Sequence, residues 1–158
     1  YDVVTTGATI GTSETNTITL IPAAVTGTTK PTVTPVTNTT TVRGMTLVKE
    51  QALDANCDKT PDTAFGQGPV TATPGQCIVY QIQARNTSTT AAGFPITSVL
   101  ISDEFSKFAP NATYVVGSLT AINGDKLEGT DRVTTTLATL AAQGTATMQL
   151  KVQIKPGL

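Results

Sequence analysis

The sequence predicts an all-β protein, an antiparallel β-sandwich that follows an extended N-terminal arm. The chain has 158 residues and is rich in threonine, whose β-branched side chain suits the solvated face of a sheet. Short stretches in which apolar and polar residues alternate recur along the chain, with turn residues between them. We find no stretch with the periodicity of a long helix, so we expect strands joined by turns.

The expected strands of the sandwich begin at Met45. They cover residues 45–53, 78–85, 96–102, 113–118, 132–140 and 145–155. In the fourth strand, Tyr114 and Val116 are expected to face inward. The last strand has the clearest alternation, and two sets of residues should face opposite ways. The inward set is Met148, Leu150, Val152 and Ile154, and the outward set is Thr147, Gln149, Lys151 and Gln153.

The first 44 residues differ in composition from the rest of the chain. Residues 1–21 hold short β-like stretches, in which Ile10, Ile18 and Leu20 are apolar positions. Residues 22–42 carry prolines among threonines, a composition that favours extended backbone and indicates a linker or an extended arm. We therefore divide the chain into an extended arm and Pro/Thr-rich linker at 1–44 and a sandwich at 45–158.

Charge and hydropathy exclude two classes of partner. The net charge is −1 and charged residues make up 13% of the chain, so no basic surface is expected to attract nucleic acid. No apolar run reaches the roughly 18 residues of a membrane span, so we expect no membrane insertion. The chain begins at Tyr1, and we interpret it as a mature product whose export signal has been removed.

The chain has two cysteines, Cys57 and Cys77, which permit one intramolecular disulfide. In a chain of this composition we favour a disulfide, which is typical of exported proteins, over two buried thiols. The expected location is therefore extracellular or on a cell surface.

The segment from Asp54 to Asp62 spaces oxygen-bearing side chains as a calcium loop does. The candidate ligands of a structural Ca²⁺ are Asp54, Asn56, Asp58, Thr60 and Asp62, with Thr60 offering its carbonyl oxygen. Lys59 stands where glycine would allow a sharp turn, and Phe65 stands where a bidentate glutamate would complete the loop. Two interpretations stay open: a calcium site, or an acidic turn whose side chains cap their own backbone.

Catalysis is not expected. The chain has no histidine, which removes the usual general base and most zinc sites. The acidic pairs Asp103–Glu104 and Asp125–Glu128 are expected to be solvated charges in loops. No nucleophile stands beside a base that could activate it, so the sequence does not predict an enzyme.

Four phrases of the sequence occur together: LVKEQALDANCD at 47–58, PGQCIVYQI at 74–82, RNT at 85–87 and VLISD at 99–103. In combination they resemble the bacterial surface-protein repeat family catalogued as domain of unknown function number eleven. The resemblance covers about residues 45–155. It implies an immunoglobulin-like β-sandwich from a large exported or cell-surface protein, and it implies no activity.

Two functions follow as hypotheses. The first is a structural subunit of a bacterial extracellular filament, in which the N-terminal arm adds as a strand to the sheet edge of another copy. The arm positions that would carry this assembly are Ile10, Ile18 and Leu20. The alternative is an adhesin or stalk repeat that binds host, glycan or protein ligands.

Overall fold

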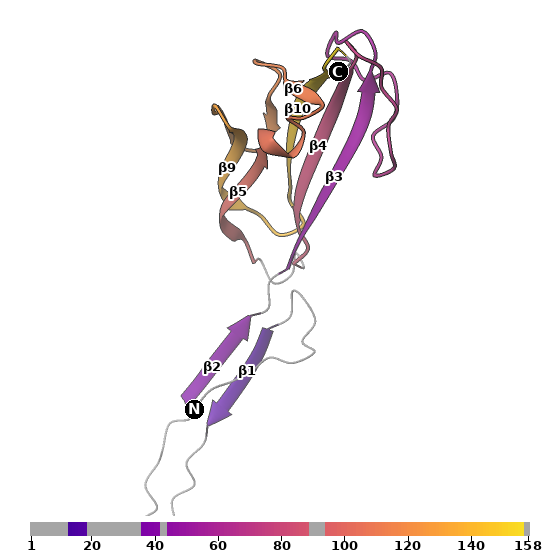
Figure 1. Ribbon diagram of the computed structural model, residues 1–158. Helices are drawn as coiled ribbons and strands as arrows, with labels where there is room; N and C mark the ends of the chain where they lie inside the picture. Colours follow the sequence, from indigo (N-terminus) through magenta and orange to yellow (C-terminus); the bar gives the residue numbers. More distant parts are fainter. Residues whose placement is uncertain (1–12, 19–35, 42–43, 89–93, 157–158) are drawn as a thin grey trace, which may run out of the picture.

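The computed structural model describes residues 13–18, 36–41, 44–88 and 94–156 (Figure 1). The described residues form ten strands and a single 3₁₀ turn, η2 (Phe105–Lys107). All strand pairs are antiparallel. The all-β prediction is confirmed, and the main body is an antiparallel sandwich of two sheets.

The larger sheet has the strand order β3-β4-β10-β6. Its strands are β3 (Met45–Asp54), β4 (Cys77–Asn86), β10 (Thr145–Ile154) and β6 (Ala112–Tyr114). A further short strand, β7 (Thr120–Ile122), also pairs with β10. The last strand of the chain is therefore central, with β4 on one side and β6 and β7 on the other.

The smaller sheet has the order β5-β9-β8. Its strands are β5 (Ile96–Glu104), β9 (Arg132–Leu140) and β8 (Asp125–Glu128). Asn123 has a positive φ of 62°, and Gly124 packs against Thr135 and Leu137 of β9. This turn between β7 and β8 carries the chain from the larger sheet to the smaller one.

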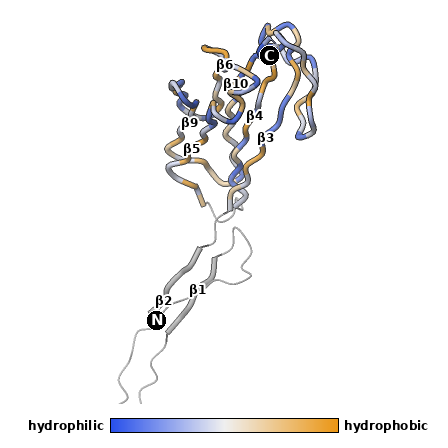
Figure 2. The backbone as a smooth tube through the Cα atoms, viewed as in Figure 1, coloured by the Kyte–Doolittle hydropathy of each residue, from blue (hydrophilic) through white to orange (hydrophobic). Residues whose placement is uncertain are grey.

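The core lies between the two sheets. Inward residues of β4, β10 and β9 are buried as the alternation predicts, and Figure 2 shows hydrophobic residues recurring along these strands. Met148, Leu150 and Val152 are at most 1% exposed, and Ile154 packs against the core from its edge. The most buried core residues also include Leu119, Val133, Ala146, Ala84, Ile82, Val99 and Ile101.

The two sheets differ in width. The described strands of the two sheets approach each other mainly where β4 meets β5, β10 meets β9 and β7 meets β8. Strand β3 reaches β5 through the ion pair of Lys49 and Asp103. Figure 1 shows β3 on the side of β4 that is away from β5. The larger sheet therefore extends one strand beyond the smaller one.

The N-terminal region contains a pair of strands rather than one extended arm. Strand β1 (Ser13–Ile18) pairs with β2 (Val36–Thr41), and they form a two-stranded sheet of their own, which we call the N-terminal ribbon. Residues 36–41 lie within the segment that was expected to be a linker. The proline and threonine content of that segment favoured the linker interpretation, so its strand was not predicted. Ile10 and Leu20 lie outside the described residues.

Three further expectations are corrected. The strand expected at 113–118 ends at Tyr114, and Val116 is 84% exposed rather than inward. The acidic pair Asp103–Glu104 ends strand β5, with Asp103 buried, rather than lying in a solvated loop. The pair Asp125–Glu128 bounds β8, an edge strand too short and too exposed to leave an apolar pattern in the sequence.

Candidate functional site

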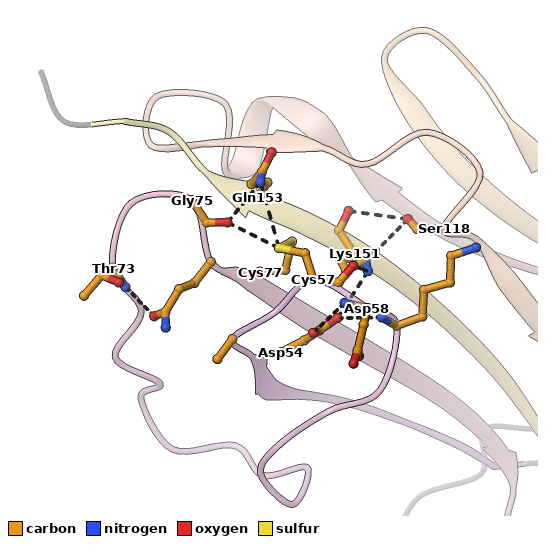
Figure 3. Close-up of a disulfide and its surroundings, with 12 residues drawn as sticks. Asp54, Cys57, Asp58, Thr73, Gly75, Cys77, Ser118, Lys151 and Gln153 are labelled. Atoms are coloured by element: carbon orange, nitrogen blue, oxygen red, sulfur yellow. Dashed lines mark hydrogen bonds and ion pairs between the residues drawn. A yellow bond between two sulfur atoms is a disulfide. The ribbon is translucent and has the colours of Figure 1, made fainter.

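Cys57 and Cys77 form a disulfide with a Cα–Cα distance of 5.2 Å, as predicted (Figure 3). Cys77 is the fully buried first residue of β4, and its register partner on β3 is Asp54. The bond ties the start of the connection between β3 and β4 to its end, so residues 55–76 form a closed loop, which we call the disulfide loop. A disulfide of this kind fits an oxidising compartment.

The first turn of the disulfide loop lies over the outer face of the larger sheet, where Lys151 of β10 stands. Lys151 was expected to face outward, and its position is on the outer face, opposite Val79 of β4. Its side chain is nevertheless only 4% exposed, and that of Asp54 is 0% exposed. Strand alternation predicted the correct face of the sheet, but it carries no information about what covers that face.

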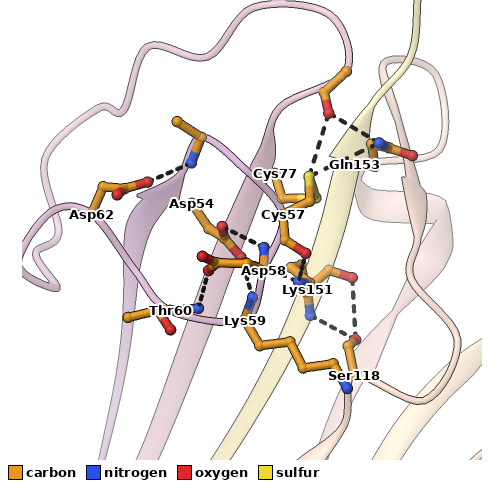
Figure 4. Close-up of polar contacts among 12 residues, drawn as sticks. Asp54, Cys57, Asp58, Lys59, Thr60, Asp62, Cys77, Ser118, Lys151 and Gln153 are labelled. Carbon is orange, nitrogen blue, oxygen red and sulfur yellow. Dashed lines mark hydrogen bonds and ion pairs between the residues drawn. A yellow bond between two sulfur atoms is a disulfide. The ribbon is translucent and has the colours of Figure 1, made fainter.

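Lys151 and Asp54 form a buried ion pair. The Nζ atom of Lys151 lies 3.2 Å from Oδ2 of Asp54 and also donates to the carbonyl oxygen of Cys57, at 2.8 Å (Figure 4). One ammonium group thus joins β10, the end of β3 and the disulfide loop. A buried charge requires partners of this kind, because the low-dielectric interior disfavours an unpaired ion.

The carboxylate of Asp54 also holds the backbone of the loop. Its Oδ1 accepts a hydrogen bond from the backbone N–H of Asp58, and its Oδ2 accepts one from the backbone N–H of Lys59, both at 3.1 Å. Lys59, which stands where glycine would allow a sharp turn, has a positive φ of 84°. Cys57 also has a positive φ, of 56°.

The remaining candidate calcium ligands lie in the same turn. Oδ1 of Asp58 accepts from the backbone N–H of Thr60 at 2.9 Å, and Oδ2 of Asp62 accepts from the backbone N–H of Ala55 at 2.7 Å. Asn56 is exposed. Across the described ranges, no group of three or more acidic, histidine or cysteine side chains could hold a metal ion. The acidic side chains cap backbone N–H groups here, and calcium binding stays a prediction.

A second ion pair joins the two sheets. Nζ of Lys49 on β3 lies 2.8 Å from Oδ2 of Asp103 on β5, and 4.6 Å from the centroid of the Tyr80 ring. Burial raises the pKa of Tyr80, and the Asp103 carboxylate adds to the shift. The Lys49 side chain is 42% exposed, so this pair contributes less to stability than the buried one.

Aromatic residues line a cavity of about 510 Å³ at another end of the sandwich, which we call the aromatic hollow. The Phe105 ring stacks on Tyr114, with centroids 4.6 Å apart, and Phe108 lies 5.8 Å from Phe105. Burial raises the pKa of Tyr114 to about 12, and the Glu128 carboxylate adds to the shift. Phe105 and Phe108 were not among the site residues predicted from the sequence. The signal for them was two phenylalanines three positions apart, at the two ends of the turn η2.

The polar side of the aromatic hollow includes Glu128. Its Oε2 accepts a hydrogen bond from the backbone N–H of Gly117 at 2.8 Å, and this bond holds the pKa of Glu128 below its ordinary value. Thr113, Thr130 and Lys155 also line the hollow. An apolar floor of stacked rings beside a few polar groups is the arrangement of a small ligand-binding site.

Of the predicted assembly positions, Ile18 is the one that the structure describes. It is the last residue of β1, and its register partner is Val36 of β2. The structure therefore brings Ile18 beside its own chain, within the N-terminal ribbon. No strand pairing between the ribbon and the sandwich is present among the described residues.

Comparison of the chain with protein-family models, with curated proteins and with solved structures finds no match. The resemblance to the bacterial surface-protein repeat family therefore stays a prediction. Among the residues that the structure describes, no helix has the length and apolarity needed to cross a membrane.

Proposed function

We propose that this protein is a structural subunit of a bacterial extracellular polymer, which assembles with copies of itself through its N-terminal region. The observation that carries the proposal is the N-terminal ribbon, a two-stranded sheet that belongs to neither sheet of the sandwich. Isolated two-stranded sheets are marginally stable in water and need a third strand or a packed face. A second copy of the chain offers sheet edges on which that need can be met.

The chemistry of the sandwich supports a structural role outside the cell. The disulfide loop and the buried pair of Lys151 and Asp54 fasten one end of the larger sheet, which suits a protein that must persist without cellular maintenance. The buried titratable groups are engaged: Asp54 holds Lys151 and two backbone N–H groups, and Asp103 holds Lys49. Such engaged groups hold the fold together and are poorly placed to transfer protons to a substrate.

The experiment compares the full chain with a variant that lacks residues 1–43. Electron microscopy and sedimentation velocity of the full chain should show long assemblies of repeating subunits. The shortened chain should keep its circular dichroism spectrum and cooperative unfolding, because its core lies wholly within residues 45–154, and it should sediment as a monomer. A full chain that stays monomeric at all accessible concentrations would overturn the proposal.

The second candidate, an adhesin or stalk repeat, is favoured by the aromatic hollow. Stacked rings with neighbouring threonine, glutamate and lysine side chains are suited to bind a glycan or a peptide side chain. A glycan array probed with the full chain tests it. The comparison variant is Phe108→Ala, which removes one of the rings that line the aromatic hollow. Specific binding that the variant loses, in a protein that forms no polymer, would favour this candidate.

A further inference from the structure

The outermost strand of the larger sheet carries apolar residues that its own sandwich does not cover. Met45, Leu47 and Lys49 of β3 are in register with Asn86, Ala84 and Ile82 of β4, so all six lie on the face that points to the smaller sheet. Ala84 and Ile82 are 1% and 4% exposed, whereas Met45 is 51% exposed and Leu47 is 65% exposed. The core therefore ends at β4. We call this face of β3 from Met45 to Lys49 the uncovered strip of β3; at its end, the partly exposed Lys49 pairs with Asp103 of β5.

The chain covers the second half of β3 itself. Gln51 exchanges two backbone hydrogen bonds with Gly66 of the disulfide loop, at 2.9 and 3.1 Å. Val70 and Ala72 of the same loop pack against the core. The covering segment stops there, so the uncovered strip is the half of β3 that the loop does not reach.

Strand β5 is the strand of the smaller sheet that lies next to this gap. Eight of its nine residues pair with β9 along one edge, and the described strands and loops supply no backbone partner for its other edge. A strand added to that edge would widen the smaller sheet by one strand, opposite β3. It would then cover Met45 and Leu47 and complete the sandwich.

Another stretch of edge is open on β9. Beyond Thr136, where the pairing with β8 ends, residues 137–140 have no second strand partner among the described residues. Leu137 and Leu140 are already 8% and 3% exposed. A hollow of about 670 Å³, lined in part by Leu137, Ala138 and Leu140, adjoins this edge. Because these leucines are already nearly buried while Leu47 is 65% exposed, an added strand would bury more apolar surface beside β5, which is the better acceptor.

We propose that the N-terminal ribbon of a second copy adds its strand β1 to the outer edge of β5, over the uncovered strip of β3. This inference rests on the proposed function and names the two surfaces that assembly joins. Each is incomplete in the same sense: the ribbon lacks a third strand, and the smaller sheet lacks a fourth. A β-strand is the occupant that satisfies both an open backbone edge and an uncovered apolar face.

The orientation of β5 fixes which end of β1 meets which part of the strip. Asn86 pairs with Met45 and donates to the carbonyl oxygen of Leu140, and Leu140 pairs with Ile96. Strands β3 and β5 therefore begin at the same end of the sandwich. A strand that adds antiparallel to β5 would run from the Lys49 end of the strip to its Met45 end.

This direction matches the chemistry of β1. Its last residue, Ile18, would reach the apolar end of the strip, near Leu47. Its acidic residue, Glu14, is four positions earlier, an even number that keeps it on the same face, at the end where Lys49 stands. Apolar residues would then meet apolar residues, and the Glu14 carboxylate would lie beside the ion pair of Lys49 and Asp103.

The test uses the full chain and two leucines of matched exposure. Leu47 is 65% exposed on β3, and Leu127 is 68% exposed on β8, at the far edge of the smaller sheet. Because both are exposed, Leu47→Glu and Leu127→Glu should fold equally well, which thermal unfolding checks. Burial of one leucine corresponds to a roughly ten- to hundredfold change in the critical concentration for assembly. We expect that rise for Leu47→Glu and none for Leu127→Glu.

A cross-link identifies the donor. Copies with Ile18→Cys and copies with Leu47→Cys are mixed and treated with a short bismaleimide, which leaves the native disulfide intact. We expect a dimer of one copy of each kind, and none when Leu127→Cys replaces Leu47→Cys. Polymer that forms normally from Leu47→Glu, or a link within a single chain that carries both cysteines, would overturn this inference while leaving the proposed function in place. A wild-type chain that never polymerises would instead remove the proposed function.

Discussion

The ammonium group of Lys151 lies 3.2 Å from the carboxylate of Asp54, which is 97 residues away in the chain, and both side chains are buried. The pair holds together the middle strand of the larger sheet, the end of β3 and the turn that carries the disulfide. It also places a positive charge against the first residue of the predicted calcium loop. The structure thus contains a cation of its own at that carboxylate.

Loss of the lysine should destabilise the protein strongly. In Lys151→Met the carboxylate of Asp54 stays buried without its counter-charge, and we expect the free energy of unfolding to fall by about 3–5 kcal/mol. Urea unfolding measures this, with Lys107→Met, at an exposed position, as the control that should change stability by less than about 0.5 kcal/mol. A loss no larger than that of the control would show that the pair is not a structural anchor.

The aspartate should be coupled to the lysine. Asp54→Asn in the Lys151→Met background removes the unpaired charge and keeps one acceptor oxygen, which serves one of the two backbone N–H groups that Asp54 holds. We expect the double variant to be more stable than Lys151→Met alone. A double-mutant cycle with all four proteins measures the coupling, and simple additivity of the two changes would contradict it.

The response to calcium separates the two interpretations of the loop. Because Asp54 already holds Lys151 and the other carboxylates accept backbone N–H groups, we expect the melting temperature to be unchanged across millimolar Ca²⁺ and chelator. Calcium that bound only the folded state would raise the melting temperature by mass action. A melting temperature that rises with Ca²⁺ and falls with chelator would establish the calcium site.

Opening the disulfide should weaken the fold. The bond closes a loop between residues 20 positions apart, and its removal in Cys57→Ser/Cys77→Ser should lower the free energy of unfolding by about 3 kcal/mol. Denaturant unfolding of the oxidised protein and of the double variant gives the difference. Peptide mapping without reductant is the companion measurement, and two freely alkylated thiols in the native protein would contradict the bond.

Stability should fall at alkaline pH through Tyr114. Its pKa is about 12 in the folded protein against 10.0 for the ordinary side chain, so above pH 10 the unfolded chain binds fewer protons than the folded one. The stabilisation is complete below pH 10 and is lost as pH rises towards 12. Unfolding followed at several pH values should show this slope, and Tyr114→Phe should reduce it. An equal slope in both proteins would contradict the assignment.

Local patterns predicted the strands but not what covers them. The alternation of β10 gave the inward positions of Met148 and Leu150 correctly, because a period of two is a property of the strand alone. The burial of Lys151 depends on a loop that begins almost a hundred residues earlier, and no local signal reports it. The same holds for Leu47, whose exposure depends on which strand of the second sheet lies opposite.

The sequence predicted which acidic residues share the turn, and their role as calcium ligands stays a prediction. The spacing of Asp54, Asp58 and Asp62 brought them to one turn, as expected, and the missing glycine appeared as the positive φ of Lys59. Spacing alone does not tell a carboxylate that binds a metal from one that caps a backbone N–H, since both require an oxygen turned into the loop.

The unequal width of the two sheets has a consequence for the architecture of any assembly. On the side of β8, the chain itself passes from one sheet to the other at Asn123, whereas on the side of β3 the sandwich is one strand short. If the ribbon of one copy adds to β5 of the next, as we propose, each copy donates one ribbon and accepts one. Such head-to-tail contacts build an unbranched row whose two ends are chemically different, or a ring where the rotation between copies closes.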